Sequence, residues 1–82
     1  MNEKDIMDII TTTIREVFDD ESLVISESTG QNDIEEWDSL AQIRIILLLE
    51  REFGIKFDVE KVGTYSTVGD IFNAVKHLID GR

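Results

Sequence analysis

Residues 38–55 read DSLAQIRIILLLEREFGI, and the apolar pattern of this segment determines the fold class. Asp38 is a residue type that begins helices, because its side chain can accept a hydrogen bond from the first turn. Gly54 is a residue type that ends them, because glycine adopts the left-handed conformation at low cost. The segment therefore predicts a helix from residue 39 to residue 52 or 53.

This predicted helix has two apolar faces where a surface helix needs only one. At 100° per residue, one face holds Ile45, Leu48, Leu49 and Phe53, and the other holds Leu40, Ile43 and Leu47. A chain of this size cannot wrap its central helix on all sides. We therefore interpret the second face as a partner-binding stripe. The alternative is that the preceding loop covers it.

Two further helices and one short helical turn are predicted on either side of this segment. Apolar residues recur at helical spacing over residues 3–18 and again over residues 67–79, with a brief turn between residues 58 and 62. Asn2 is the expected cap of the first helix. Thr67 and Asp70 have the spacing of a capping box at the last one.

A long segment without helical periodicity, residues 19–38, separates the first two helices. A connection of this length is unusual in a small domain unless its own apolar residues hold it down. We expect five of them to pack on the core: Leu23, Val24, Ile25, Ile34 and Trp37. Because no alternating strand pattern occurs, the prediction is one all-α domain over residues 1–82. It is a small three- to four-helix bundle with a long loop between the first two helices.

Composition excludes several classes of protein. The chain has 82 residues, no cysteine, a single histidine and a formal charge of −10, which rules out disulfides and multi-histidine zinc sites. A surface this acidic repels nucleic acid and anionic membranes, and no apolar run is long enough to span a bilayer. We expect a cytoplasmic monomer that does not bind nucleic acid or insert into membranes.

No pattern of catalytic or metal-binding residues stands out. The one histidine, His77, lies far along the chain from Ser39, and no phosphate-binding glycine loop occurs. The acidic residues of the long loop do not have the spacing of a calcium-binding loop. The expectation is a protein that is not an enzyme and has no metal site.

The triplet Asp38-Ser39-Leu40 places a hydroxyl at the start of the apolar helix. An anion attached to Ser39 would lie beside the unpaired N–H groups and the positive end of the helix dipole. This position suits a serine that carries a phosphate ester. From these residues alone, simple capping by Asp38 remains the alternative.

Three segments together resemble the acyl carrier protein family: Asp38-Ser39-Leu40, the run LLEREFGI at 48–55, and Ser66-Thr67-Val68. The resemblance implies that Ser39 receives a phosphopantetheine arm, from coenzyme A, through a phosphopantetheinyl transferase. Asp38 and Leu40 would support this motif. The thiol of the arm would carry acyl groups as thioesters between acyl-loading and acyl-transferring enzymes.

The sequence departs from typical fatty-acid carriers on the second helix. Ala41 and Arg44 stand where those proteins have acidic residues, and Arg51 lies near a third such position. We therefore expect a free-standing carrier of a specialised pathway, which binds its partners through Leu40, Ile43, Arg44 and Leu47. The alternatives are a peptidyl or aminoacyl carrier, and a helical interaction module that is never modified.

Overall fold

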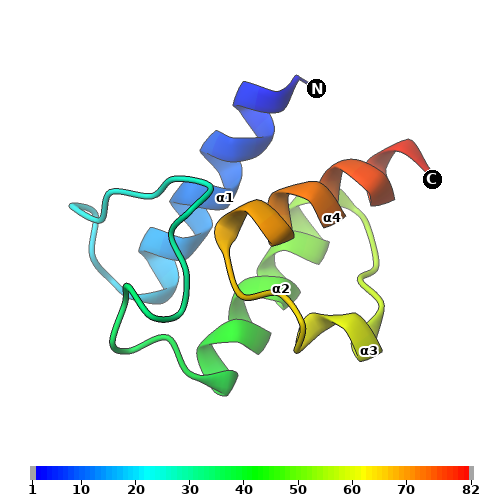
Figure 1. Cartoon of the computed structure of the whole chain (residues 1–82). Coiled ribbons are helices and arrows are strands. Elements are labelled where there is room, and N and C mark those ends of the chain that lie inside the picture. Colours follow the sequence, from blue (N-terminus) through cyan, green and yellow to red (C-terminus); the bar gives the residue numbers. More distant parts are fainter. Residues whose placement is uncertain (1, 82) are drawn as a thin grey trace.

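The computed structural model describes residues 2–81, and this part of the chain forms four helices (Figure 1). They are α1 (Glu3–Val17), α2 (Ser39–Phe53), α3 (Val59–Val62) and α4 (Val68–Asp80). The prediction of a small all-α bundle with a long loop between the first two helices is confirmed, with four helices rather than three. The predicted bounds differ from the observed ones by no more than one residue.

The helix ends follow from the capping residues in the sequence. Asn2 accepts a 2.8 Å hydrogen bond from the backbone N–H of Asp5, and Asp38 accepts one of 2.9 Å from that of Ala41. Gly54 ends α2 in the left-handed conformation, with φ of 64°. These local bonds satisfy backbone groups that a helix end otherwise leaves unpaired.

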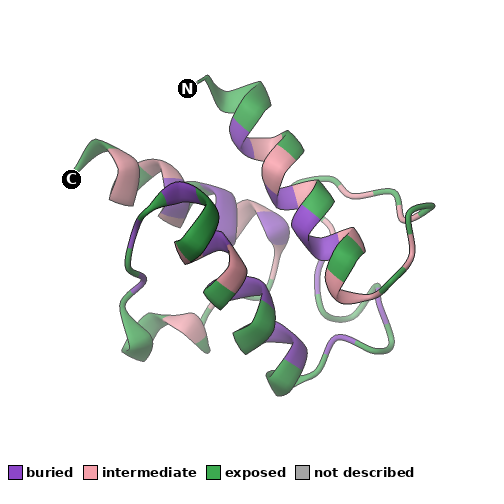
Figure 2. Ribbon diagram, turned by 180° about the vertical axis from the view of Figure 1, so that it is seen from behind, coloured by how far each residue is buried: buried purple, intermediate pink, exposed green. Residues whose placement is uncertain are grey.

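The core lies between α1, α2 and α4, and each of these helices turns one side inward (Figure 2). Each buried aliphatic side chain stabilises the fold by about 1.5–3 kcal/mol relative to exposure. The largest fully buried side chains are Ile10, Ile14, Ile45, Leu49, Val68, Ile71 and Val75.

The buried side of α2 is wider than the sequence predicted. Ile46 and Gln42 are buried, whereas Leu48, which was assigned to the core face, is only partly buried. The difference arises because the segment after α2 folds back along the helix and brings α3 beside it. A helical pattern shows which residues share a face, but not which distant segment will cover that face.

The long loop is held to the core by some of its apolar residues. Trp37 and Ile34 are buried, and the Trp37 ring contacts that of Phe18 at a centroid distance of 5.8 Å. The prediction for Val24 is wrong, because its side chain is 86% exposed. Its neighbours Leu23 and Ile25 are partly buried, so the loop turns these two side chains toward the core and Val24 away from it.

The same loop also caps α4 through its backbone. The N–H groups of Val68 and Gly69 donate to the carbonyls of Thr29 and Glu27 at 2.7 and 2.8 Å. Gly30 pairs with Thr67 at this crossing, where an added Cβ would come within 2.5 Å of the Ser66 carbonyl oxygen. The close approach therefore requires glycine, and it fixes the loop that leads to Ser39.

Candidate functional site

Ser39 lies at the first position of α2, exposed at one end of the bundle. Within residues 2–81, its hydroxyl makes no hydrogen bond, and the backbone N–H groups of Ser39 and Leu40 have no partner either. The first turn of α2 contains no acidic residue, unlike the first turns of the other helices. The hydroxyl is therefore accessible, and an attached phosphate would face free N–H donors at a positive helix end.

Asp38 has a defined structural task beside this serine. Its carboxylate accepts from the Ala41 N–H, and its carbonyl accepts from the Gln42 N–H at 3.0 Å. Capping by Asp38 and modification of Ser39 are therefore compatible, because the cap uses no atom of Ser39.

A cavity of about 770 Å³ opens beside Ser39, between α2 on one side and α3 with the segment before it on the other. Asp38 and Ser39 lie at its α2 N-terminal end, and Glu50 lies three turns further along the helix. Glu50 accepts a 2.8 Å hydrogen bond from the backbone N–H of Phe57, which ties the two walls together. Apolar side chains form much of the lining: Ile43, Ile46, Leu47, Phe57, Val59 and Val62.

The predicted stripe on α2 faces solvent. Leu40, Ile43 and Leu47 are 66%, 49% and 57% exposed, so the loop does not cover them and that alternative is wrong. Arg44 is exposed on the same helix and forms no ion pair with any residue in 2–81. The structure thus places all four residues on the surface of α2, within the first two to three turns after Ser39. Their role in binding partners remains a prediction.

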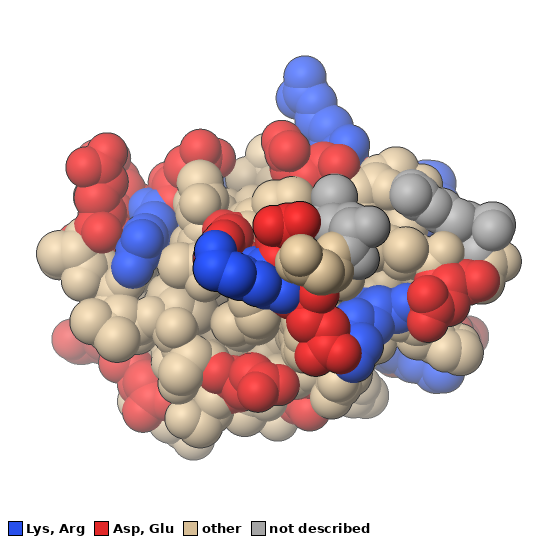
Figure 3. All heavy atoms as spheres, turned by 90° about the horizontal axis from the view of Figure 1, so that it is seen from above, with Lys and Arg blue, Asp and Glu red and all other residues tan. Residues whose placement is uncertain are grey.

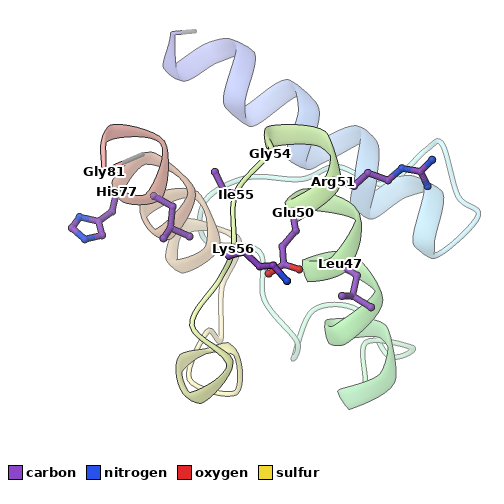
Figure 4. Close-up of a pocket in the computed structure, with 9 residues that line it drawn as sticks. Leu47, Glu50, Arg51, Gly54, Ile55, Lys56, His77 and Gly81 are labelled. Atoms are coloured by element: carbon purple, nitrogen blue, oxygen red, sulfur yellow. The ribbon is translucent and has the colours of Figure 1, made fainter.

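A second hollow, of about 830 Å³, lies between the C-terminal ends of α2 and α4 (Figure 4). Arg51 and His77 both line it, but Figure 4 shows their side chains pointing away from it on opposite sides. These two side chains do not converge on a common point, and Ser39 does not line this hollow. It is therefore a weaker candidate for a ligand site than the cavity beside Ser39.

The titratable groups with shifted pKa values lie away from the Ser39 cavity. Burial raises the pKa of Tyr65, and the negative charge of Asp58 acts in the same direction. Hydrogen bonds from Ser66 lower the pKa of Asp70. Neither side chain lines the cavity beside Ser39.

Across residues 2–81, no three His, Asp or Glu side chains gather as a metal site would require, and no helix is long and apolar enough to cross a membrane.

The sequence did not assign the α2 residues Gln42, Ile46 and Glu50 to the site, nor Gln31 or any of the cavity residues that follow α2. Gln42 could have been noticed as the only uncharged polar residue between Ser39 and the end of α2. For Ile46 no signal existed, because the run Ile45 to Leu49 is apolar at every position.

The geometry is that of a small helical protein that presents an exposed hydroxyl, at the N-terminus of α2, beside a largely apolar cavity. Comparison with known proteins agrees. A family model described as "phosphopantetheine attachment site" matches residues 8–75. The solution structure of a holo acyl carrier protein from Geobacter metallireducens is similar, with a TM-score of 0.82 and 36% sequence identity. The match covers 90% of this chain and 85% of that one. No curated protein sequence matches.

The chain belongs to the family of phosphopantetheine-binding carrier proteins, and it is similar to acyl carrier proteins. This family carries groups for other enzymes and is not itself catalytic, as the sequence predicted. The predicted cofactor, phosphopantetheine, is that of the family. The chain offers features that fit it: an exposed hydroxyl, free N–H groups for its phosphate, and an adjacent cavity.

Proposed function

We propose that this protein is an acyl carrier whose phosphopantetheine arm is attached to Ser39 by a phosphopantetheinyl transferase that uses coenzyme A. The arm carries acyl groups as thioesters between the enzymes of a specialised pathway. The observation that supports Ser39 most directly is its free, exposed hydroxyl at the unpaired N-terminus of α2. Asp38 caps the helix directly before Ser39, and Leu40 follows Ser39 on the exposed side of the helix.

The proposal also assigns the partner-binding surface. Leu40, Ile43 and Leu47 supply exposed apolar area on the side of α2 that begins beside Ser39, and Arg44 supplies a positive charge with no ion-pair partner in residues 2–81. The enzymes that load and unload the arm would bury this stripe and place an acidic side chain opposite Arg44. The protein acts as a cytoplasmic monomer in this proposal, as one domain over residues 1–82.

Intact mass tests the attachment site. The purified chain is incubated with coenzyme A and a phosphopantetheinyl transferase, and we expect it to gain the mass of one arm. Ser39→Ala should gain none while it keeps the helical content and melting temperature of the parent. Ser22→Ala, a change of another exposed serine, should be modified normally.

The outcomes separate the candidate functions. A parent chain that is never modified would support the unmodified interaction module. A Ser39→Ala chain that still gains the arm would show that Ser39 is the wrong serine. Loading the modified chain with fatty-acyl or aminoacyl groups, and measuring which thioester forms with its native enzymes, distinguishes an acyl carrier from a peptidyl carrier.

A further inference from the structure

Gln42 is a polar side chain buried inside the bundle, only 4% exposed, one turn after Ser39 on α2. Its amide forms three hydrogen bonds to two separate parts of the chain. The indole N–H of Trp37 donates to its oxygen at 2.7 Å. Its own NH₂ group donates to the carbonyls of Val62 at 3.1 Å and Tyr65 at 3.3 Å.

The orientation of this amide follows from its neighbours. One side faces a donor and the other faces two carbonyls, so only one placement of oxygen and nitrogen satisfies all three bonds. Both N–H donors of Gln42 are therefore used within the protein. Although Gln42 lines the cavity beside Ser39, it has no donor left for a ligand there.

The segment that Gln42 holds has little buried surface of its own in α3, although Val62 and Tyr65 pack partly against the core and the Tyr65 ring contacts that of Phe57. α3 has four residues and none of them is buried (Figure 2); Val59, at its start, is 86% exposed. Val62 is its last residue, and Tyr65 follows in the turn toward α4. Short elements with few buried contacts open at a lower free energy than the core. The hydrogen bonds of Gln42 therefore contribute to the free energy of local opening of α3.

The other side of the network leads to Ser39. Trp37 is 5% exposed and lies two residues before Ser39, at the end of the loop that enters α2. If Gln42 turned away, the buried indole N–H would lose its acceptor, which carries a penalty beyond the loss of one average hydrogen bond. The position of α3 and the position of the loop before Ser39 are therefore linked through one side chain.

We propose that Gln42 is a positioning residue that closes α3 against α2 and couples this wall of the cavity to the Trp37 loop. Breaking its bonds to Val62 and Tyr65 frees α3, and the wall of the cavity opens without unfolding of the core. A role of this closure in carrier function rests on the proposed attachment of the phosphopantetheine arm to Ser39. The coupling itself is a property of the unmodified chain.

Native-state hydrogen exchange on the unmodified chain tests the coupling. The reporters are the amides of Lys61, Thr64 and Tyr65, which bond to carbonyls within and just before α3, and the indole N–H of Trp37. The reference is the exchange of core amides in α1 and α4. Trp37 is the only tryptophan of the chain, so its indole signal is unambiguous.

Two substitutions of Gln42 separate the effect of its bond to Trp37 from the effect of its bonds to Val62 and Tyr65. Gln42→Met removes all three bonds, and we expect the α3 amides and the Trp37 indole to exchange at least about tenfold faster relative to the core amides. Gln42→Glu, at a pH where its carboxyl is ionised, keeps an acceptor for Trp37 but removes the donors to Val62 and Tyr65. In that variant we expect only the α3 amides to exchange faster, while the indole stays protected.

Two further variants complete the experiment. Gln31→Ala removes a longer, exposed bond to the same Tyr65 carbonyl, 3.4 Å in length, and should leave the exchange pattern unchanged. Trp37→Phe removes the indole donor but leaves the bonds from Gln42 to Val62 and Tyr65 in place. We therefore expect this variant to fold with α3 attached. We expect its α3 amides to exchange severalfold faster relative to the core amides, because the Gln42 oxygen no longer accepts the hydrogen bond that fixes the orientation of the amide.

The proposal is overturned if the α3 and core amides lose protection equally in the Gln42 variants, which would make Gln42 a residue of general stability only. It is also overturned if Gln31→Ala has the same effect, or if Trp37→Phe leaves α3 exchange unchanged. None of these measurements uses the arm. A failure to modify Ser39, seen by mass, would therefore be a separate result.

Discussion

Leu47 projects from the middle of α2 into solvent, whereas Leu49, two residues further on, is fully buried. The same residue type thus has two different tasks on one helix. Truncation of a buried leucine leaves a cavity and costs about 2–5 kcal/mol, whereas an exposed leucine leaves none. Stability measurements can therefore separate residues that hold the fold from residues that meet a partner.

Leu47→Ala should lower the free energy of unfolding by less than about 1 kcal/mol and slow acyl transfer with the native partner enzymes. Thermal melts and transfer kinetics measure the two effects. Leu49→Ala is the matched control, with a large loss of stability. A loss of several kcal/mol in Leu47→Ala would place this side chain in the core and contradict the exposed stripe.

Arg44 lies on the same exposed surface of α2, and Arg44→Glu tests whether its positive charge contributes to partner binding. We expect weaker transfer with the native partner, by about 1 kcal/mol or roughly fivefold, because an exposed ion pair with the partner is reversed. Recognition by enzymes that act on typical acidic carriers should improve, because specificity is a difference between affinities. Unchanged kinetics with both classes of enzyme would remove Arg44 from the docking surface.

At the scale of elements, the N-terminus of α4 is the most densely bonded helix end. The Asp70 carboxylate accepts from the backbone N–H groups of Ser66 at 3.0 Å and Thr67 at 3.2 Å, and the Thr67 hydroxyl accepts from the Asp70 N–H. This is the capping box that the sequence predicted, with Asp in place of the usual Glu. The hydrogen bond from Ser66 lowers the pKa of Asp70 most, against a smaller opposing effect of burial.

Because the folded state lowers this pKa, the ionised carboxylate of Asp70 stabilises the fold above the ordinary pKa of aspartate. This contribution is lost as the pH falls through the lower folded value. We expect Asp70→Asn to be less stable than the parent by about 1 kcal/mol at neutral pH. The gap should shrink as the pH falls below the ordinary aspartate range. Denaturant unfolding of both chains against pH measures it, and a gap independent of pH would contradict the assignment.

At the scale of the whole molecule, charge is the dominant feature. The chain has eighteen acidic residues and eight Lys and Arg. On the face seen in Figure 3, the acidic side chains are spread out rather than gathered in one patch. Among residues 2–81 only two ion pairs form, Lys4 with Asp8 and Lys76 with Glu3. The remaining carboxylates repel one another, and this repulsion destabilises the compact state.

Added salt should therefore raise the melting temperature by a few degrees. Raising the ionic strength from about 10 mM to about 150 mM shortens the screening length from roughly 30 Å to 8 Å, which weakens repulsion between exposed carboxylates. Millimolar Mg²⁺ should act in the same direction. A melting temperature that stays constant or falls across this range would contradict the conclusion that repulsion between carboxylates destabilises the fold.

Much of this protein could be predicted from its sequence because the decisive signals are local. The helix ends follow from Asn2, Asp38, Gly54 and Thr67, whose side chains or backbone act within one turn. The exposed stripe on α2 followed from a count of its apolar faces. The serine motif and its spacing from the Phe-Gly-Ile turn indicated the carrier family.

The tertiary structure decided what depends on segments distant in sequence. Gln42 and Ile46 are buried because residues 57–65 fold back along α2, and nothing near Gln42 in the sequence indicates that Val62 and Tyr65 will accept its hydrogen bonds. The need for glycine at position 30 likewise depends on how the long loop crosses the start of α4. Local periodicity fixes which side chains share a face, but only the packing of remote segments determines which faces become the wall of a cavity.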